Sequence, residues 1–281
     1  MKKSTRVEKA KETLKIIEQG TYQVSDTTVD VKKQITYSIQ NSYLYKPATL
    51  DELLINLEAK IATLDYDTTI AVVNNTVLEA GSRLALKNEK IGCLNFASAK
   101  NPGGGFLGGA VAQEESLALS SSLYGSLTAN FAMYEHNRSQ PTLLYSDMMI
   151  WSPEVVMFRD DNGNLLAKPY NMSIVTSPAV NAGAIRNNRP YELEDAPAVM
   201  MARTDKVLGL MLHHGMEHLL LGAWGCGVFR NDPNDVAAYF ASFLKPGAKY
   251  GRCFKSVVFA VLDRSEDGKN VTAFEKAFEL K

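Results

Sequence analysis

The sequence predicts an α/β protein of three layers, in which helices cover both faces of a central mixed sheet. Several short apolar runs lack the alternation of half-exposed strands, so they indicate strands that are buried on both faces. Stretches with helical periodicity separate these runs, as expected where helices cover a sheet. With 281 residues, 46% of them hydrophobic and 22% charged, the chain is long enough for one sizeable core.

The first 66 residues are predicted to form an accessory extension to a core domain of residues 67–281. Helical periodicity marks both ends of this extension, and the segment between them is rich in Val, Ile, Thr and Tyr. Its expected elements are a helix over residues 5–18 that stops at Gly20, one or two strands within residues 28–45, and a helix over residues 50–64 that is capped by Thr49.

In the core domain, predicted strands alternate with predicted helices. The expected strands cover residues 70–74, 91–96, 148–157, 172–176 and 256–262, and a further strand begins at His218. The expected helices cover residues 76–86, 116–127, 200–214 and 271–280. A polar loop between the third and fourth strands indicates a hairpin, and residues 188–198 are expected to be an exposed connection.

A glycine-rich stretch follows the strand predicted at residues 91–96. Gly103, Gly104 and Gly105 are consecutive, and a simple turn needs only one of them. Because glycine has no Cβ, the backbone here can take positive φ angles and approach a ligand closely. Ligands of α/β sheets bind beyond the carboxyl ends of the strands. We therefore expect a catalytic loop at this position.

Glu114 and Glu115 lie at or just before the first turn of the helix predicted over residues 116–127. Free amides and the helix dipole favour carboxylates there, so one interpretation is a helix-capping acidic pair. Adjacent helical side chains diverge by about 100°, which argues against two carboxyls on opposite sides of a glycosidic bond. The catalytic interpretation is that one glutamate transfers a proton while the other holds a hydroxyl. Partial burial and the neighbouring charge would raise the pKa of the acid.

A second glycine-rich element, residues 218–233, consists of a predicted strand, a glycine-spaced loop and a helix that Asp232 caps with Pro233 at its first position. Loop amides beside a helix N-terminus suit a diphosphate, although Gly-x-Gly alone also fits a plain turn. Cys226 is interpreted as a small packed residue, with a nucleophile as the alternative. Phe229 is expected against a sugar or base, with a core position as the alternative.

Charge and cysteine content limit the classes of partner. A formal net charge of −1 provides no overall field for nucleic acid, so sequence-specific recognition of nucleic acid is not expected. Three cysteines without a CxxC pair favour a reducing, cytoplasmic setting. The N-terminus lacks the apolar stretch of a signal peptide, and no run approaches the ~20 apolar residues of a membrane span. We expect a monomer with no membrane partner.

The run of residues 94–105, followed after seven intervening residues by Gln113, Glu114 and Glu115, resembles the signature of the poly(ADP-ribose) glycohydrolases. The likeness is greatest to their bacterial, microbial-type branch, and residues 222–229 resemble its second hallmark. The resemblance covers nearly the whole chain. It implies a macrodomain that binds ADP-ribose and hydrolyses the ribose–ribose O-glycosidic bond of poly(ADP-ribose), with no metal and no cofactor. Since the net charge suits capture of one terminal unit, we expect exo-type release of ADP-ribose.

The resemblance also implies roles for single residues. Glu115 would protonate the leaving oxygen and then activate water, and Glu114 would hold a hydroxyl of the scissile ribose. The positions expected to bind substrate are Asn101, Gly103, Gly104, Gly105, Gln113, Asn181, Gly225, Cys226, Gly227, Val228 and Phe229. One departure is Leu119, where the family pattern often has arginine, and we expect it to bear on rate or chain preference.

Two other functions fit the same motifs. One is a module that only binds ADP-ribose, although such a module has no need of the paired glutamates. The other is hydrolysis of single ADP-ribose units from a protein, a nucleic acid or a metabolite. If Glu115 is the general acid, activity is expected to fall at alkaline pH as this residue loses its proton.

Overall fold

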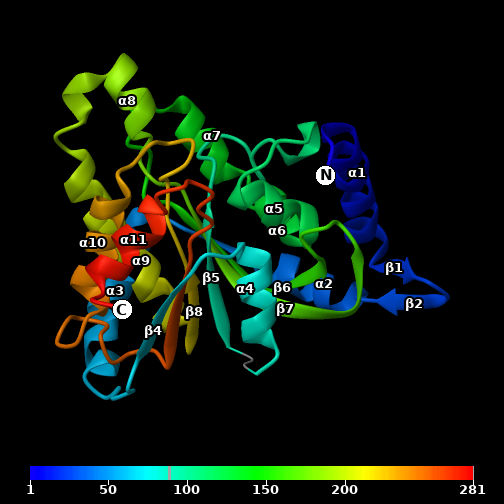
Figure 1. Ribbon diagram of the computed structural model, residues 1–281, viewed down its shortest axis with the longest axis horizontal. Helices are drawn as coiled ribbons and strands as arrows, with labels where there is room; N and C mark the ends of the chain where they lie inside the picture. Colours follow the sequence, from blue (N-terminus) through cyan, green and yellow to red (C-terminus); the bar gives the residue numbers. More distant parts are fainter. Residues whose placement is uncertain (88–89, 281) are drawn as a thin grey trace.

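Within residues 1–87 and 90–280, which the computed structural model describes, the centre of the molecule is a seven-stranded mixed sheet (Figure 1). The strand order is β3-β6-β7-β5-β8-β9-β4. These strands are β3 (Tyr43–Tyr45), β4 (Thr69–Val73), β5 (Ile91–Phe96), β6 (Met149–Arg159), β7 (Leu165–Ser177), β8 (His218–Leu221) and β9 (Ser256–Ala260). The five strands from β7 to β4 run parallel, whereas β6 is antiparallel to both β7 and β3.

Helices cover both faces of this sheet, which confirms the predicted three layers. One face carries α3 (Pro47–Ile61), α9 (Ala196–His213), α10 (Pro233–Leu244) and α11 (Lys269–Ala277) (Figure 1). The other face carries α4 (Val77–Ala85), α5 (Gln113–Ser120), α6 (Leu123–Ala129) and α7 (Ala132–Ser139).

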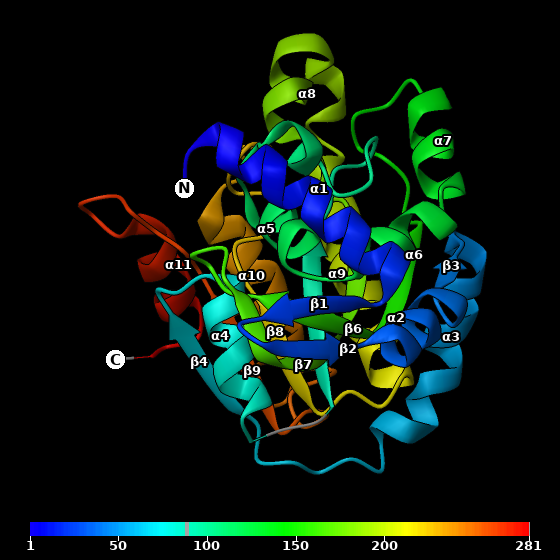
Figure 2. The same cartoon turned by 90° about the vertical axis from the view of Figure 1, so that its right-hand side faces the viewer.

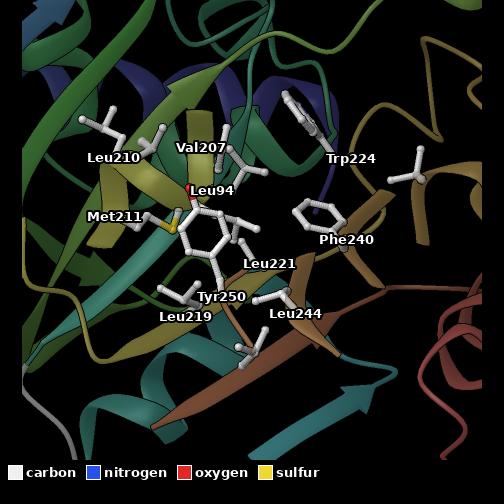
Figure 3. Packing of buried hydrophobic residues seen from close by; sticks show 14 of the residues in the cluster. Leu94, Val207, Leu210, Met211, Leu219, Leu221, Trp224, Phe240, Leu244 and Tyr250 are labelled. Carbon is white, nitrogen blue, oxygen red and sulfur yellow. The ribbon is translucent and has the colours of Figure 1, made fainter. Parts of the chain in front are cut away.

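Successive strand residues contribute to two different cores because side chains alternate across a sheet. On β8, Leu219 and Leu221 are buried against α9 and α10, while Leu220 is buried on the opposite face. Figure 3 shows the first of these cores, in which the β8 leucines lie among Val207, Leu210 and Met211 of α9 and Phe240 and Leu244 of α10. Burial on both faces explains why these strands read as continuous apolar runs.

The N-terminal residues supply α1 (Lys3–Gln19), the hairpin of β1 (Thr21–Val24) and β2 (Thr27–Asp30), and α2 (Lys32–Gln40). Helix α1 ends at Gly20 in the left-handed conformation, as predicted. The strand β3 also comes from this part of the chain, and it pairs with β6 at the edge of the main sheet. The boundary at residue 66 stays a prediction.

Two local predictions were incomplete and two were wrong. Residues 28–45 contain α2 as well as strands, because Val31 and Ile35 pack against Val156 and Phe158 of β6. The helix near residue 50 begins at Pro47 after Lys46, so Thr49 is not its cap. Residues 188–198 contain a short 3-10 helix (Pro190–Glu192) and the start of α9, and α8 (Ala182–Asn188) precedes them.

The second wrong prediction concerns the helix expected over residues 116–127, which is broken into α5 and α6. Ser121 is extended and forms a β-bridge with Met157 of β6. Its hydroxyl donates to Leu117 O at 2.6 Å and accepts from Leu123 N at 3.2 Å, so one side chain satisfies the ends of both helices. Helix α5 begins at Gln113 and carries both glutamates in its first turn.

Among the described residues, no helix combines the length and the apolar character that a membrane crossing requires.

Candidate active site

The loops after β4, β5, β8 and β9 surround a cavity of about 720 Å³ at the carboxyl edge of the parallel strands. Most of the predicted site residues line it: Asn101, Gly104, Gly105, Gln113, Glu114, Glu115, Gly225, Cys226, Gly227, Val228 and Phe229. The two glycine-rich stretches therefore meet in one cavity, as expected for loops that follow the adjacent strands β5 and β8.

Glu114 is the buried member of the acidic pair, with 3% of its surface exposed. Asn95 Nδ2 lies 3.3 Å from Glu114 Oε1, and the main-chain N–H of Ser98 donates to Oε2 at 2.7 Å. Burial raises the pKa of Glu114 to about 8, although these two donors act in the opposite direction. Glu114 is therefore a largely protonated, fixed carboxyl at neutral pH.

Glu115 is only partly buried, and its carboxyl also faces the cavity. The N–H of Gly105 donates to Glu115 Oε1 at 2.9 Å. Gly104 has a φ of +58°, and a Cβ at this position would overlap the Glu115 carboxyl and lie 3.1 Å from Glu114 Oε2. Gly104 is thus required for the two carboxyls to occupy these positions beside the loop.

Gln113 connects the first turn of α5 to the end of β5. Its Oε1 accepts from Phe96 N at 2.9 Å, and its Nε2 donates to Leu94 O at 2.8 Å. The side-chain amide thereby extends the hydrogen bonding of β5 and fixes where the helix begins. This geometry fits the expectation that Gln113 shapes the loop.

The loop Gly225–Phe229 lines the same cavity as the acidic pair. Asn231 closes this loop, since its Nδ2 donates to Val180 O at 2.9 Å and to Gly225 O at 3.1 Å. The main-chain amides of Gly227, Val228 and Phe229 donate to no described residue. Consecutive free amides of this kind can bind an anion such as a diphosphate.

Phe229 is held by residues outside its own loop. Its carbonyl accepts from Gly183 N at 2.8 Å, and its ring lies 6.0 Å from that of Tyr145. Tyr145 has a φ of +60°, and the fully buried Arg203 donates to its carbonyl at 3.2 Å. A bulky residue in this conformation is strained, which indicates that the surrounding contacts impose its position.

Two predicted positions do not line the cavity. Gly103 is a buried residue of the loop and packs against Phe106 and Ala118. Asn181 caps α8, because its Oδ1 accepts from Ala184 N at 3.0 Å. Leu119 is also absent from the cavity wall and packs with α1 instead.

The thiol of Cys226 fits the interpretation of a small packed residue. Burial raises its pKa to about 12, so the reactive thiolate is scarce at neutral pH.

Several lining residues were missed by sequence reasoning. They lie in the turn after β4, in the loop after β9 and at the start of α11, and are Asn75, Thr76, Asp263, Arg264 and Asn270. Asn74 and Asp263 join these two segments, with Asn74 Nδ2 donating to Asp263 O and Asp263 N donating to Asn74 Oδ1, both at 2.9 Å. The available signal was that polar residues follow both apolar strands. Asn95, which lies beside the Glu114 carboxyl, was also missed. Its signal was a lone amide in an otherwise apolar run.

The chain is similar to known proteins of one family. Residues 10–160 match the family described as microbial-type PARG, catalytic domain. The X-ray structure of poly(ADP-ribose) glycohydrolase from Thermomonospora curvata is 42% identical with a TM-score of 0.92, over 98% of this chain and 100% of that one. A structure of the same protein bound to the inhibitor ADP-HPD is 42% identical with a TM-score of 0.90, over the same shares of both chains.

A further relative is the poly(ADP-ribose) glycohydrolase of Deinococcus radiodurans in complex with ADP-ribose. It is 41% identical with a TM-score of 0.83, over 89% of this chain and 99% of that one. Among curated proteins, none matches this chain. The sequence motifs, the mixed macrodomain-like sheet and these matches agree, and the chain belongs to the family of microbial-type poly(ADP-ribose) glycohydrolases.

Proposed function

We propose that this chain hydrolyses the ribose–ribose O-glycosidic bond of poly(ADP-ribose). The observation that carries the proposal is a single cavity lined both by Glu114 and Glu115 and by the free amides of Gly227–Phe229. Such a cavity offers an acid to a sugar and an anion site to the diphosphate attached to it. Two relatives support the same ligand class, since their structures hold ADP-ribose and the inhibitor ADP-HPD.

The order of the strands indicates how ADP-ribose lies in the cavity. The loop with the acidic pair follows β5, the loop with free amides follows the adjacent β8, and Asp263 and Asn75 follow β9 and β4. Neighbouring strands are about 4.8 Å apart, so these four strand ends span about 14 Å. We infer that the terminal ribose, the diphosphate and the adenosine occupy these loops in that order.

Glu115 is proposed as the catalytic acid and base. Its proton passes to the bridging oxygen as the bond from this oxygen to the anomeric carbon breaks, which leaves an oxocarbenium-like ribose. Water then adds to the anomeric carbon and returns a proton to Glu115. We assign this role to Glu115 because Glu114 is almost fully buried, with a donor beside each of its oxygens. Glu114 is proposed to hold a ribose hydroxyl.

The other site residues follow from the same placement. Gln113 and the glycines Gly104 and Gly105 are proposed to shape the loop over the ribose, and Asn101 lies at its edge. The residues Gly225–Phe229 are proposed to hold the diphosphate, with the Phe229 ring against the terminal ribose. We also propose exo-type cleavage, because a cavity of about 720 Å³ suits one nucleotide-sized ligand.

The test compares wild type with Glu115→Ala. We expect the wild type to release ADP-ribose from poly(ADP-ribose), and the variant to lose this activity while it still binds ADP-ribose in a calorimeter. Chromatography of the products decides the mode of attack, since monomers alone indicate exo-type cleavage and short oligomers indicate internal cleavage. A wild type that leaves polymer intact, or that acts only on singly modified substrates, would refute the proposal.

A further inference from the structure

Resting on the proposed function, we propose that helix α1 completes the active site, with Arg6 and Thr13 as positioning residues. Neither residue lines the cavity. Each instead holds a segment that carries the chemistry: Arg6 holds the catalytic loop, and Thr13 holds the far end of α5. Figure 2 shows α1 crossing directly over α5.

The first contact is between Arg6 and the catalytic loop. Arg6 Nε donates to the carbonyl of Gly109 at 2.7 Å, across 103 positions of sequence. The two backbones also approach closely at this point, because a Cβ on Gly109 would lie 2.9 Å from the carbonyl oxygen of Lys3. The end of the loop is therefore docked against the first turn of α1.

Farther along α1, towards its C-terminal end, the helix packs against the catalytic loop and α5. Ala10 is fully buried in a small apolar cluster with Phe106 of the loop and Ala118 of α5. The Phe106 ring also lies 5.0 Å from that of Tyr124. The loop therefore packs between α5 and α1, and α1 comes from the N-terminal end of the chain.

The second contact is at the C-terminal end of α5. The buried hydroxyl of Thr13 donates to Leu119 O at 2.6 Å, and Arg159 Nε donates to the same carbonyl at 3.3 Å. Arg159 in turn pairs with Glu12 of α1 at 3.0 Å. Helix termini have unpaired carbonyls, so these donors stabilise the end of α5 and fix it to α1.

Backbone hydrogen bonds connect the Arg6 contact at Gly109 to the carboxyl of Glu115. Gly105 O accepts from Ala110 N at 3.1 Å, and this N–H belongs to the same peptide group as the Gly109 carbonyl that Arg6 holds. The N–H of Gly105 donates to Glu115 Oε1. A shift of Gly109 would therefore move the donor that orients the Glu115 carboxyl. Small misplacements of a reacting group slow catalysis strongly, even when their origin is distant.

The experiment compares Arg6→Ala with Arg6→Lys and with a matched control, Lys11→Ala. Lys11 lies on the same helix with the same charge and is exposed. We expect Arg6→Ala to lower kcat on poly(ADP-ribose) about tenfold, the order of effect when a hydrogen bond from a charged donor is lost. KM and the affinity for ADP-ribose are expected to change by less than about twofold, because the diphosphate loop is held by Asn231.

Arg6→Lys keeps the charge and a donor, and is expected to recover part of kcat, while Lys11→Ala is expected to match wild type. Equal kcat in Arg6→Ala and Lys11→Ala would overturn the proposal. A parallel loss of kcat and ADP-ribose affinity would also overturn it, because that pattern indicates a general structural defect. Thr13→Val replaces Arg6→Ala if the latter does not fold, with the same expected change in kcat.

Amide hydrogen exchange separates this proposal from the proposed function. In Arg6→Ala, the peptide covering residues 103–110 is expected to exchange faster than in Lys11→Ala, while strands β5 and β8 keep their protection. If the wild type cleaves no polymer, the glycohydrolase proposal fails and the exchange result still decides the role of α1. Unchanged exchange in this peptide would refute that role.

Discussion

At the scale of single residues, Gly104 sets the distance between the catalytic loop and both carboxyls. Its φ is +58°, and the space that a Cβ would occupy holds the Glu115 carboxyl. We predict that Gly104→Ala lowers kcat about a hundredfold or more, because the carboxyl must move and misplaced reacting groups lose about that much. Activity on poly(ADP-ribose) and thermal unfolding are the measurements.

Gly108→Ala is the matched control, because it lies in the same loop and a Cβ there would meet no atom within 4 Å. It is expected to keep near wild-type activity. Equal activity in the two variants would show that the loop can adjust to a side chain at Gly104, and that the close approach has no catalytic consequence.

We predict that Glu114 makes the stability of the folded protein depend on pH. Burial raises its pKa from 4.5 to about 8, so between these values the folded state binds a proton that the unfolded state has lost. Stability from this group is therefore fully present below about pH 4.5 and is lost as pH rises towards about 8, at up to about 1.4 kcal/mol per pH unit.

Glu114→Gln keeps the shape and cannot ionise, so its stability relative to wild type is expected to increase as pH rises from 5 to 8 and then to level off. Urea unfolding of both proteins at pH 5, 6, 7, 8 and 9 measures this difference. A difference that is constant over the whole range would mean that Glu114 does not hold a proton in the folded protein.

At the scale of elements, the loop between β8 and α10 depends on Asn231. Its side-chain amide holds two carbonyls of the loop and its surroundings, and its main-chain N–H donates to Gly225 O at 3.1 Å. We predict that Asn231→Ala weakens ADP-ribose binding about tenfold, because the free amides lose their fixed arrangement. Calorimetry with ADP-ribose measures the affinity.

Asn234→Ala is the control for this prediction. Asn234 is exposed at the start of α10, and within the described residues its side-chain amide donates a hydrogen bond only to Asp232. The affinity of the Asn234→Ala variant for ADP-ribose is expected to equal that of wild type. If Asn231→Ala also binds normally, the loop holds its shape without this side chain.

The elements also show what the sequence could and could not predict. The strand over residues 91–96 was predicted at its observed bounds, because a strand buried on both faces leaves a continuous apolar run. The helix over residues 116–127 was predicted whole, although Ser121 pairs with β6 and breaks it. Such pairing depends on residues far away in the sequence and leaves no local pattern.

The site was likewise predicted only where its residues leave a local pattern in the sequence. Glycines and paired glutamates marked the two loops that meet at the cavity, since their composition is unusual for simple turns. Which glutamate is buried could not be predicted, because it depends on Asn95 and Ser98 lying against one of the two carboxyls. Nor could the role of Tyr145, whose position follows from contacts with Arg203 and Phe229.

At the scale of the whole molecule, the cavity depends on strands that are distant in sequence and adjacent in the sheet. Its walls follow β4, β5, β8 and β9, and both helical layers cover these strands. A ligand that contacts all four loops links parts of the chain from Asn75 to Asn270. Binding to the folded state alone stabilises it by an amount set by ligand concentration and affinity.

We therefore predict that ADP-ribose raises the midpoint of thermal unfolding more than AMP or ribose 5-phosphate does at the same concentration. ADP-ribose at 100 times its Kd adds about 2.7 kcal/mol of stability, which raises Tm by several degrees in a domain of this size. Ribose 5-phosphate would occupy only the β5 end of the cavity, and AMP only the β9 and β4 end. Each is therefore expected to bind more weakly than ADP-ribose and to raise Tm less. Scanning calorimetry on Glu115→Ala, which is expected to bind without turnover, measures all three ligands. An equal shift with AMP alone would mean that the terminal ribose and the second phosphate add no binding energy, and the proposed contacts of ADP-ribose with the loops after β5 and β8 would be wrong.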